Sequence, residues 1–515
     1  MNHRESETIV SSAVISNEFL EHAKKTFLNE SQVEKFLAFC RQPLRKSIRV
    51  NTLKISVLEF KAIARQWGLE LTAIPWCAEG FWVKFETSGS ETSDFKTPDS
   101  KAPDSEAIDS ASVDSGPLSL GNFPEHLQGL FYIQEASSML PPLALLHSLK
   151  SAQSDPPHCP LVLDLAAAPG SKTTQLAAML ANRGLVLANE MSASRVKVLH
   201  SNLVRCGVTN TCMSQFDGRK LGKRLSSLFD YVLLDAPCGG EGTVRKDHMA
   251  LKDWQLSNLQ SIAKLQKELI LIAYQCLKPG GRLVYSTCTL SPEENHQVAE
   301  YLLEQTDAKI SRLNELFVGA DKAVTEQGFL HVLPQIYDSE GFFVAAFTKP
   351  ADATTEFCSK MESPPFKPLD KKTGQQVQTY YQSHFGFNLA QTDYLIQQRD
   401  KEIWLFPKNF PLVSDVVRLN RSGIKLAEIY PNKIRSTHEF ACGFSKLTDR
   451  QVLEIDRPMA QEFYKGRNLE IDAHSLDDGE VIISYNNHAI GIGRLAKNKV
   501  KNQLPRDLVK DQIQF

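Results

Sequence analysis

Two cysteines follow strand-like segments at positions where a thiol can do chemistry. Cys238 lies in D-A-P-C-G-G, at the end of the apolar run F-D-Y-V-L-L, and Cys288 lies in Y-S-T-C-T-L at 285–290. Asp235 precedes Cys238 by three residues. An activated thiol is a nucleophile, and a carboxylate can hold or move a proton. The pattern therefore predicts covalent catalysis that uses two thiols and a carboxylate.

The other cysteines carry no comparable signal. The chain has ten cysteines and no C-x-x-C pair, so neither a structural zinc site nor another metal site is predicted. Five of the ten sit in or beside apolar segments, which is typical of small buried side chains. These are Cys40, Cys159, Cys206, Cys212 and Cys276.

The two thiols must be positioned by a sheet. From about residue 160, short apolar runs alternate with helical segments, which is typical of a parallel sheet covered by helices on both faces. We expect strands at 161–165, 185–189, 211–216, 231–235 and 282–287. Ligands bind such α/β sheets beyond the carboxyl ends of the strands. The fourth and fifth strands are expected neighbours, so Cys238 and Cys288 should share one pocket.

The first strand runs into A-A-A-P-G-S-K-T-T at 166–174, a loop whose small residues allow a ligand to approach the backbone. Its tail resembles a phosphate-binding loop, but that motif needs an earlier glycine where this chain has Leu165. The dinucleotide fingerprint G-x-G-x-x-G is also absent from this loop. The loop therefore favours close approach of a ligand other than a pyrophosphate.

Three carboxylates end consecutive expected strands: Glu190, Asp217 and Asp235. One such residue alone is more often a helix cap, but three in succession gather along one edge of the sheet. Glu190 is placed to bind ribose hydroxyls. Acidic surroundings repel a phosphate and suit a cation, so we expect S-adenosylmethionine, whose sulfonium is positive, as the cofactor.

The residue types also suggest what the thiols do. The C5 atom of a pyrimidine is a poor nucleophile, and addition of a thiolate to C6 makes it able to accept a methyl group. The C5 proton must then leave and the thiol must be expelled, while an acid near N3, a role that Asp235 can fill, accepts charge. Chemistry alone leaves open whether Cys238 or Cys288 attacks.

Length and composition indicate the number of domains and the class of protein. The 515 residues suggest about three domains, and no run approaches the ~18 apolar residues of a membrane span. With no secretory signal at the N-terminus, a cytoplasmic protein without a membrane partner is expected.

The net charge of −2 hides an asymmetry, because residues 86–116 contribute −6 and the remainder is +4. We interpret 86–116, with its repeated D-S, as a disordered acidic insertion. Residues 494–510 hold six bases, and Lys497, Lys499 and Lys501 are predicted to bind RNA phosphates.

Several motifs together resemble the NOL1/NOP2/sun family of RNA cytosine-C5 methyltransferases. They are R-K-S-I-R-V-N-T-L-K, Y-I-Q-E-A-S-S-M-L, D-L-A-A-A-P-G-S-K-T, F-D-G, L-L-D-A-P-C-G-G-E-G-T and V-Y-S-T-C-T-L-S-P-E-E-N, within residues 40–350. The resemblance implies that Cys288 is the nucleophile, that Cys238 assists release and that Asp235 faces the base. It implies a cofactor site formed by Ala166, Ala167, Ala168, Pro169, Gly170, Ser171, Lys172, Glu190, Asp217 and Asp235.

The C-terminal segments L-N-R-S-G-I-K-L-A-E-I and Y-N-N-H-A-I-G-I-G-R-L resemble the PUA-like extension of one bacterial branch of that family. That resemblance implies methylation of 16S rRNA at cytosine 1407, within the 30S subunit, by a monomer. The expected fold is α/β, a class I Rossmann-like methyltransferase sheet with an α+β N-terminal region and a mainly β C-terminal region. The expected domains are 1–150 for RNA recognition, 151–350 for methyl transfer, 351–389 as a linker and 390–515 as a PUA-like RNA-binding domain.

Other interpretations stay open at this level. The same chemistry on another rRNA or tRNA cytosine fits the motifs. A catalytically inactive ribosome assembly factor fits the fold and the basic C-terminal region, although both cysteines are intact. A small-molecule or protein methyltransferase leaves the paired cysteines and the basic strand at 45–54 without a purpose.

Overall fold

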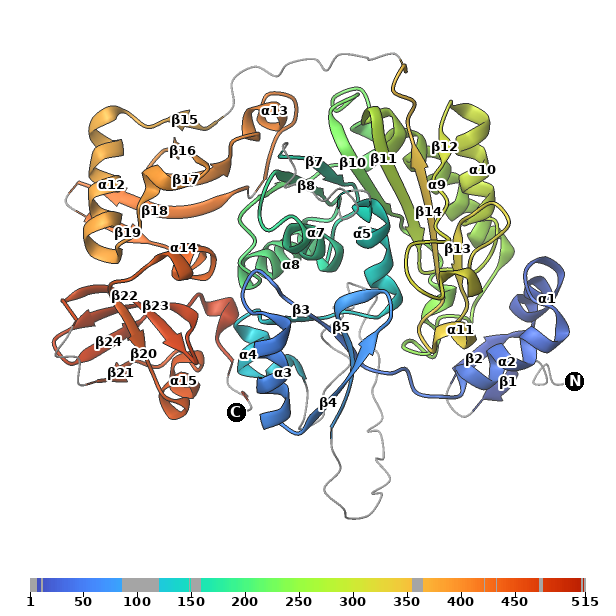
Figure 1. The fold of residues 1–515 in the computed structure, drawn as a ribbon, viewed down its shortest axis with the longest axis horizontal. Helices are drawn as coiled ribbons and strands as arrows, with labels where there is room; N and C mark the ends of the chain where they lie inside the picture. Colours follow the sequence, from blue (N-terminus) through green and yellow to red (C-terminus); the bar gives the residue numbers. More distant parts are fainter. Residues whose placement is uncertain are drawn as a thin grey trace, which may run out of the picture.

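The computed structural model of the protein describes residues 7–10, 13–85, 120–147, 149, 159–353, 365–420, 422–431, 433–471, 476–510 and 513. The acidic insertion predicted at 86–116 lies outside these residues. In the view of Figure 1, the two C-terminal sheets lie to the left of the central sheet and the N-terminal region lies below it. In the described part of the chain, no helix combines the length and apolar character that crossing a membrane requires.

The central sheet has eight strands in the order β12-β14-β11-β10-β7-β8-β9, with β13 paired to β14. Its strands are β7 (Leu161–Asp164), β8 (Leu185–Asn189), β9 (Thr211–Ser214), β10 (Phe229–Asp235), β11 (Leu277–Thr287), β12 (Lys309–Ile310), β13 (Leu330–Val332) and β14 (Phe342–Thr348). The first five of these are the predicted strands, and they run parallel to one another, whereas β14 pairs antiparallel with β11. The Rossmann-like α/β prediction is therefore confirmed.

Helices cover both faces of the sheet, because alternate strand residues point to opposite sides. Leu163 and Leu234 share a core with helices α9 (Leu256–Gln275) and α10 (His296–Gln305). The intervening residues Val162 and Leu233 share another core with α5 and α7. Helix α8 also covers this second face. The three helices there are α5 (Leu140–Leu145), α7 (Ser171–Met179) and α8 (Ala193–Arg205).

The N-terminal region combines helices with a four-stranded sheet of order β4-β5-β3-β6. Its elements are α1 (Asn17–Thr26), α2 (Glu30–Cys40), β3 (Ser47–Val50), α3 (Val57–Gln66), β4 (Leu69–Ile74), β5 (Cys77–Phe85) and β6 (Phe131–Ile133). The predicted basic strand is β3, and all four of its residues are buried. Arg49 donates to Gln134 Oε1 at 2.9 Å and to Thr174 Oγ1 at 2.8 Å, so this cation joins the N-terminal sheet to α7.

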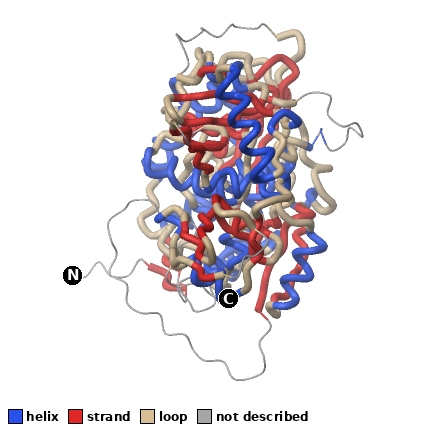
Figure 2. The backbone as a smooth tube through the Cα atoms, turned by 90° about the vertical axis from the view of Figure 1, so that its left-hand side faces the viewer, coloured by secondary structure: helices blue, strands red, loops and turns tan. Residues whose placement is uncertain are grey.

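Two five-stranded sheets form the C-terminal part. The first has the order β15-β16-β17-β18-β19 and consists of β15 (Lys367–Pro368), β16 (Tyr394–Arg399), β17 (Glu402–Pro407), β18 (Ile424–Tyr430) and β19 (Lys433–Ser436). The second has the order β20-β22-β23-β24-β21 and consists of β20 (Val452–Glu454), β21 (Leu469–Glu470), β22 (Gly479–Tyr485), β23 (His488–Ala496) and β24 (Lys499–Asn502). The first sheet lies above the second in both views of the molecule (Figures 1 and 2).

The range interpreted as a linker, 351–389, contains a packed helix, α12 (Lys371–Phe385). Its N-cap is Asp370, whose side chain accepts a hydrogen bond from the backbone of Thr373 at 3.0 Å. Val377, Tyr381 and Phe385 are fully buried in the core of the first C-terminal sheet. These residues recur every four positions, which places them along one face of the helix.

Candidate active site

The order of the strands reverses between β7 and β10, because β8 and β9 lie on one side and β11 on the other. Such a switch point is where α/β sheets bind ligands, since the loops that leave the two strands diverge there. The loop after β7 contains 165–170, and the loop after β10 contains 236–240. The sequence motifs singled out above therefore lie on both sides of this switch point.

The loop after β7 brings backbone close to its neighbours. Gly170 adopts a φ of +106°, and a Cβ atom placed there would lie 2.9 Å from Leu199 Cδ1. Only glycine combines that conformation with that proximity without strain. Ala167 donates its N–H to the carbonyl of Asn189 at 2.8 Å, and Ala168 accepts from Arg195 at 2.6 Å. The loop is thus fixed to the end of β8 and to α8.

The two carboxylates that follow β8 and β9 are held by nearby cations. Glu190 is buried, forms an ion pair with Arg195 at 3.2 Å and accepts the N–H of Ser192 at 2.9 Å. Asp217 forms an ion pair with Arg219 at 2.6 Å, and the hydrogen bonds that Arg219 donates to it lower the pKa of its carboxyl group. Arg195 links Glu190 to the loop after β7, whereas Asp217 pairs with its own neighbour in the chain.

Asp235 lies at the end of β10 between a cation and a hydroxyl. Its Oδ2 accepts from Lys172 Nζ at 2.6 Å, and its Oδ1 accepts from Ser286 Oγ at 2.7 Å. Lys172 is buried and also donates to Ser138 Oγ at 3.3 Å. Burial lowers the pKa of the lysine, but the charge and hydrogen bond of Asp235 outweigh it, so the net pKa is raised. This ion pair fixes both side chains at the switch point.

The structure brings the two cysteines together. Asp235 pairs with Ser286 in the register of β10 and β11, so the residues that follow leave the sheet side by side. Cys238 Sγ and Cys288 Sγ are 3.1 Å apart, within hydrogen-bonding distance, and both residues are half-buried. The hydrogen bond to Cys288, followed by burial, raises the pKa of Cys238 well above its ordinary value.

Two buried glutamates hold the cysteine loops. Glu294 accepts the N–H of Gly239 at 3.0 Å and the side chain of Gln266 at 2.6 Å, and it is fully buried. Burial raises its pKa to about 7. Glu241, which is also fully buried, accepts the N–H groups of Leu290 and Ser291 at 2.9 and 2.7 Å. The loop of Cys238 is thereby tied to the loop of Cys288.

Sequence reasoning missed these glutamates and Asp164. Asp164 is buried at the end of β7, and burial raises its pKa to about 7. Its Oδ2 accepts from Thr173 at 2.7 Å, while its buried Oδ1 has no hydrogen-bond partner. The sequence does contain a signal for Asp164. A carboxylate inside the apolar run L-V-L-D-L must be buried, and a buried carboxylate at a ligand-binding edge is a candidate for function.

Comparison with known proteins gives relatives over nearly the entire chain. The chain is 44% identical over 506 residues to ribosomal RNA small subunit methyltransferase F of Psychromonas ingrahamii, covering 96% of this chain and 98% of that protein. It is 44% identical over 508 residues to the protein of the same name from Vibrio vulnificus strain YJ016, covering 98% and 100%. The chain belongs to the ribosomal RNA small subunit methyltransferase F family.

Family models agree with this membership along the chain. The 16S rRNA methyltransferase RsmB/F model matches residues 153–348, and the model of the N-terminal domain of 16S rRNA methyltransferase RsmF matches 15–97. The pre-PUA domain of methyltransferase F matches 366–443, and the methyltransferase RsmF PUA domain matches 450–510. The two C-terminal sheets therefore correspond to two separate domain families.

Solved structures share the methyltransferase fold. A methyltransferase homolog protein from Pyrococcus horikoshii is 30% identical with a TM-score of 0.50, covering 65% of this chain and 95% of that one. NSun6 from the same organism, solved with SFG, has a TM-score of 0.53 at 24% identity and covers 65% and 98%. The second likeness concerns the fold alone.

Within this member of the methyltransferase F family, the predicted site residues fall into two groups. Lys172, Asp235, Cys238 and Cys288 converge beside the carboxyl ends of β10 and β11. Glu190 connects through Arg195 to the loop after β7. Lys172 and Asp235, both expected in the cofactor site, contact each other.

Proposed function

We propose that the protein transfers a methyl group from S-adenosylmethionine to C5 of a cytosine in 16S rRNA, through a covalent bond between Cys288 and C6. The observation that carries this proposal is the approach of two thiols to 3.1 Å beside the Asp235–Lys172 pair, at the switch point of the sheet. Membership in the 16S rRNA methyltransferase family supports the substrate class. The resemblance of the C-terminal segments makes cytosine 1407 in the 30S subunit the target we test first.

The residues at the switch point fit S-adenosylmethionine. Four carboxylates, Asp164, Glu190, Asp217 and Asp235, lie at or just beyond the ends of neighbouring strands. Three of them already pair with a cation, so their part in the site would be to accept hydrogen bonds, such as those of ribose hydroxyls. Asp164 has a buried oxygen without a partner, and Gly170 permits close approach of backbone. We assign Glu190 to the ribose and Ala166, Ala167, Ala168, Pro169, Gly170, Ser171 and Asp217 to the rest of the cofactor site. S-adenosylmethionine supplies an electrophilic methyl group when bound.

The reaction on the base begins at Cys288. Its thiolate forms a bond to C6, and the electron pair of the C5–C6 double bond becomes available at C5. C5 then forms a bond to the methyl carbon as the bond from that carbon to the sulfonium breaks. Asp235, fixed by Lys172 and Ser286, faces the base, donates a proton to N3 as charge develops on the ring and takes that proton back when Cys288 leaves.

Cys238 finishes the reaction. It removes the C5 proton, the electron pair returns to the C5–C6 bond, and the Cys288–C6 bond breaks to release the thiolate. Because the pKa of Cys238 is raised, its thiol must lose a proton before it can act as this base. The 3.1 Å between the thiols means that a carbon attached to Cys288 lies beside Cys238. We therefore assign nucleophile and base as the family resemblance implies.

RNA positioning is assigned to the regions outside the central sheet. We propose that residues 1–150 and 390–515 recognise RNA and that 151–350 transfer the methyl group. Lys497, Lys499 and Lys501 are exposed on the hairpin of β23 and β24, where they can contact phosphates independently of sequence.

The test is a covalent trap. Cys238→Ala protein is incubated with S-adenosylmethionine and 30S subunits, and with naked 16S rRNA in a parallel sample, before denaturing electrophoresis. A protein–RNA band should accumulate, and the added change Cys288→Ala should abolish it. Sequencing of the trapped RNA identifies the cytosine. A band that survives without Cys288 reverses the two roles, and an inactive wild-type protein on every rRNA tested rejects the proposal.

A further inference from the structure

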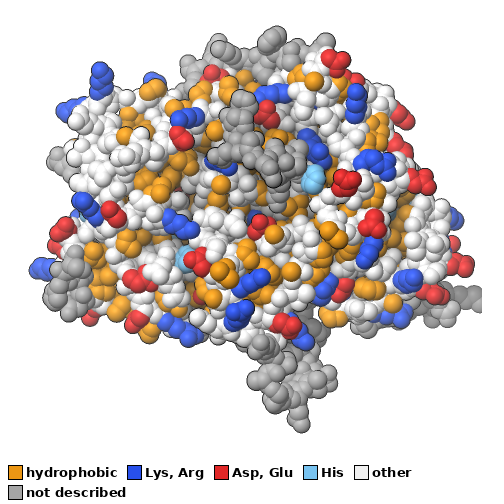
Figure 3. Space-filling view, in the orientation of Figure 1, with side chains coloured by type: hydrophobic (Ala, Val, Ile, Leu, Met, Phe, Trp, Pro, Cys, Tyr) orange, Lys and Arg blue, Asp and Glu red, His pale blue; other side chains and the backbone are white. Residues whose placement is uncertain are grey.

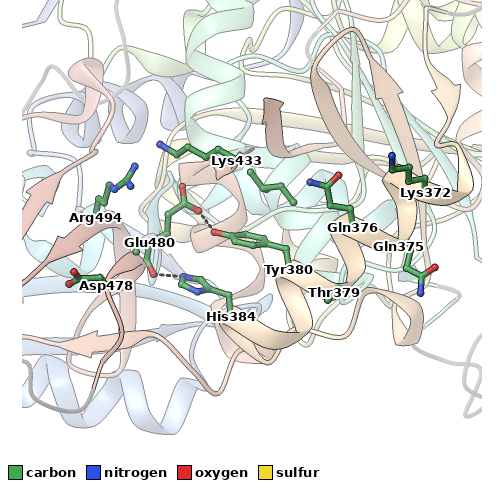
Figure 4. Close-up of a pocket in the computed structure, with 12 residues that line it drawn as sticks. Lys372, Gln375, Gln376, Thr379, Tyr380, His384, Lys433, Asp478, Glu480 and Arg494 are labelled. Atoms are coloured by element: carbon green, nitrogen blue, oxygen red, sulfur yellow. Dashed lines mark hydrogen bonds between the residues drawn. The ribbon is translucent and has the colours of Figure 1, made fainter. Parts of the chain in front are cut away.

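A cavity lies far along the chain from the cysteines, between the two C-terminal sheets. Its volume is about 850 Å³, and α12, β19, β22 and β23 supply its walls. We call it the inter-sheet cleft and define it by the residues that line it: Lys372, Gln375, Gln376, Thr379, Tyr380, His384, Lys433, Ile434, Asp478, Gly479, Glu480 and Arg494. The close-up shows the α12 side chains along one wall and Arg494 with Asp478 on the other (Figure 4).

The floor of the cleft is rigid. Tyr380 stacks on His384 with ring centroids 5.2 Å apart, and its hydroxyl donates to Glu480 Oε2 at 2.9 Å. The His384 ring is hydrogen-bonded to the Glu480 carbonyl at 2.8 Å. Glu480 is buried and also accepts the N–H of Ser436 at 3.0 Å. Because these bonds join α12, β19 and β22, the floor keeps its shape without a ligand.

The rim of the cleft is cationic. Lys372, Lys433 and Arg494 line it from three different elements, and none of them forms an ion pair with a residue that the structure describes. The two acids of the cleft are engaged elsewhere, since Glu480 holds the floor and Asp478 accepts the N–H of Lys497 at 2.7 Å. The cleft therefore offers three cations without an ion-pair partner among the described residues, while its two acids are held by hydrogen bonds, a combination suited to an anionic ligand.

The positive charge continues outward from the cleft. Arg494 lies opposite Lys501 in the register of β23 and β24, so both side chains are on the same exposed face of the hairpin. Elsewhere on the face shown in Figure 3, Lys and Arg alternate with Asp and Glu. Glu480 lies opposite Arg494 on β22, but it is buried and hydrogen-bonded, so the exposed charge along this part of the hairpin is that of Arg494 and Lys501.

We propose that the inter-sheet cleft binds an unpaired nucleotide of the substrate RNA, with its phosphates on the cationic rim and its base against α12. The volume is in the range of small-molecule sites, which are about 300–1,000 Å³. The exposed amides of Gln375 and Gln376 can hydrogen-bond a base edge, which only an unstacked nucleotide presents in full. The helix interpreted from sequence as part of a linker becomes one wall of an RNA site.

This inference rests on the proposed function, and its test separates the two. The variant Lys372→Ala/Arg494→Ala removes one cation from each wall, and Lys367→Ala/Lys371→Ala removes the same charge from exposed positions that do not line the cleft. Binding to a 16S rRNA fragment that contains an unpaired loop is measured across a salt series. The cleft variant should lower the slope of log affinity against log salt by about 1.4, because each phosphate contact on a single strand contributes about 0.7. The control should keep the wild-type slope.

Methylation and competition complete the test. With saturating RNA, the cleft variant should keep the wild-type kcat while its KM for RNA rises, because the reacting groups are untouched. A single-stranded oligoribonucleotide should compete for the wild-type protein better than the same sequence in a duplex or inorganic phosphate. A benzophenone cross-linker at Gln376 should label one unpaired nucleotide. Equal slopes for the two variants, or equal competition by duplex or phosphate, overturn the proposal. A wild-type protein that binds RNA but forms no 5-methylcytosine would instead overturn the proposed function.

Discussion

At the residue scale, the chemistry depends on how buried groups hold the two thiols. Glu294 touches both cysteine loops, since it accepts Gly239 N–H at 3.0 Å and lies 3.4 Å from Thr289 Oγ1. Its charge contributes to the raised pKa of Cys238. We infer that the Glu294 carboxylate positions Cys238 and takes up the proton that this thiol must lose before it can act as a base.

Glu294→Gln should therefore slow release of the product. We expect kcat to fall by about 100-fold, at the lower end of what acid–base groups contribute, and a covalent RNA adduct to accumulate as it does in Cys238→Ala. The wild-type rate should rise as pH increases through about 7, where Glu294 becomes charged, and the variant should lack this inflection. Rapid-quench measurements from pH 6 to pH 8.5 check both expectations.

The matched control is Glu241→Gln, because Glu241 is equally buried but contacts Leu290 and Ser291 rather than the loop of Cys238. It should lower stability and keep an inflection, which should move to lower pH because the charge of Glu241 contributes to the raised pKa of Glu294. An inflection that persists in Glu294→Gln would contradict the role of Glu294.

The raised pKa of Glu294 also predicts that the stability of the protein depends on pH. That pKa is raised from 4.5 to about 7 on folding, so between these values the folded protein binds a proton that the unfolded chain has lost. The stability that this proton contributes is therefore lost as pH rises from 4.5 through 7. Urea unfolding at pH 5 and pH 8 should show a larger loss in wild type than in Glu294→Gln. Equal losses in the two proteins would disprove this linkage.

At the scale of elements, glycines set how closely the active-site loops pack. Gly242 donates its N–H to the carbonyl of Cys288 at 2.9 Å, and Gly341 donates to the carbonyl of Gly242 at 2.9 Å. A Cβ atom at Gly242 would lie 2.2 Å from Gly341 O, which is backbone and has little freedom to move. The loops that follow β10 and β11 and the loop that precedes β14 are thus stacked through one glycine.

Gly242→Ala should destabilise the protein by about 1–3 kcal/mol, as overpacking does, and should reduce activity by moving Cys288 away from Cys238. Gly374→Ala is the contrasting change, because Gly374 lies inside α12 and a new Cβ would meet only Leu369 Cβ at 3.9 Å. It should stabilise the protein by up to about 1 kcal/mol and leave activity unchanged. Thermal melting and steady-state kinetics give both readouts, and an active, undiminished Gly242→Ala would contradict the packing argument.

At the scale of the whole molecule, the first C-terminal sheet and the central sheet share one core. Trp404, Phe406 and Phe410 belong to the same buried cluster as Leu163 and Leu187. The chain around Asn420 also covers the edge of β9, since Asn420 donates its N–H to Met213 O at 2.8 Å. A shared core and a covered strand edge make these two sheets one cooperative unit.

Phe410→Ala should lower the stability of both sheets together, by about 3–5 kcal/mol, because it leaves a cavity where Phe410 stacks on Phe406. Amide hydrogen exchange should show lost protection in β9 and in β17. Phe463→Ala is the matched control, since Phe463 belongs to the separate core of the second C-terminal sheet, and its effect should stay within β22 and β23. Protection lost from β17 but kept in β9 after Phe410→Ala would show that the sheets unfold independently.

The sequence by itself determined the fold class and grouped the residues of the candidate site. Unbroken apolar runs between helices predict a parallel sheet, because a strand buried on both faces is built mainly of apolar residues. Residues at the ends of neighbouring parallel strands must meet at one edge, so Asp235, Cys238 and Cys288 could be grouped from their spacing alone. The resemblance to a known family then gave the two cysteines separate roles.

Only the tertiary structure decided which groups surround those residues. Glu294 lies far in sequence from its partners Gly239 and Gln266, and nothing local in S-P-E-E-N indicates them. Likewise, Arg49 of the basic strand is buried against Gln134 rather than exposed to RNA. The segment that holds α12 looked like a linker because its few apolar residues form a narrow stripe that becomes a core only when β17 and β18 cover it. Burial and hydrogen bonding depend on the packing of distant segments, whereas periodicity reports only the segment itself.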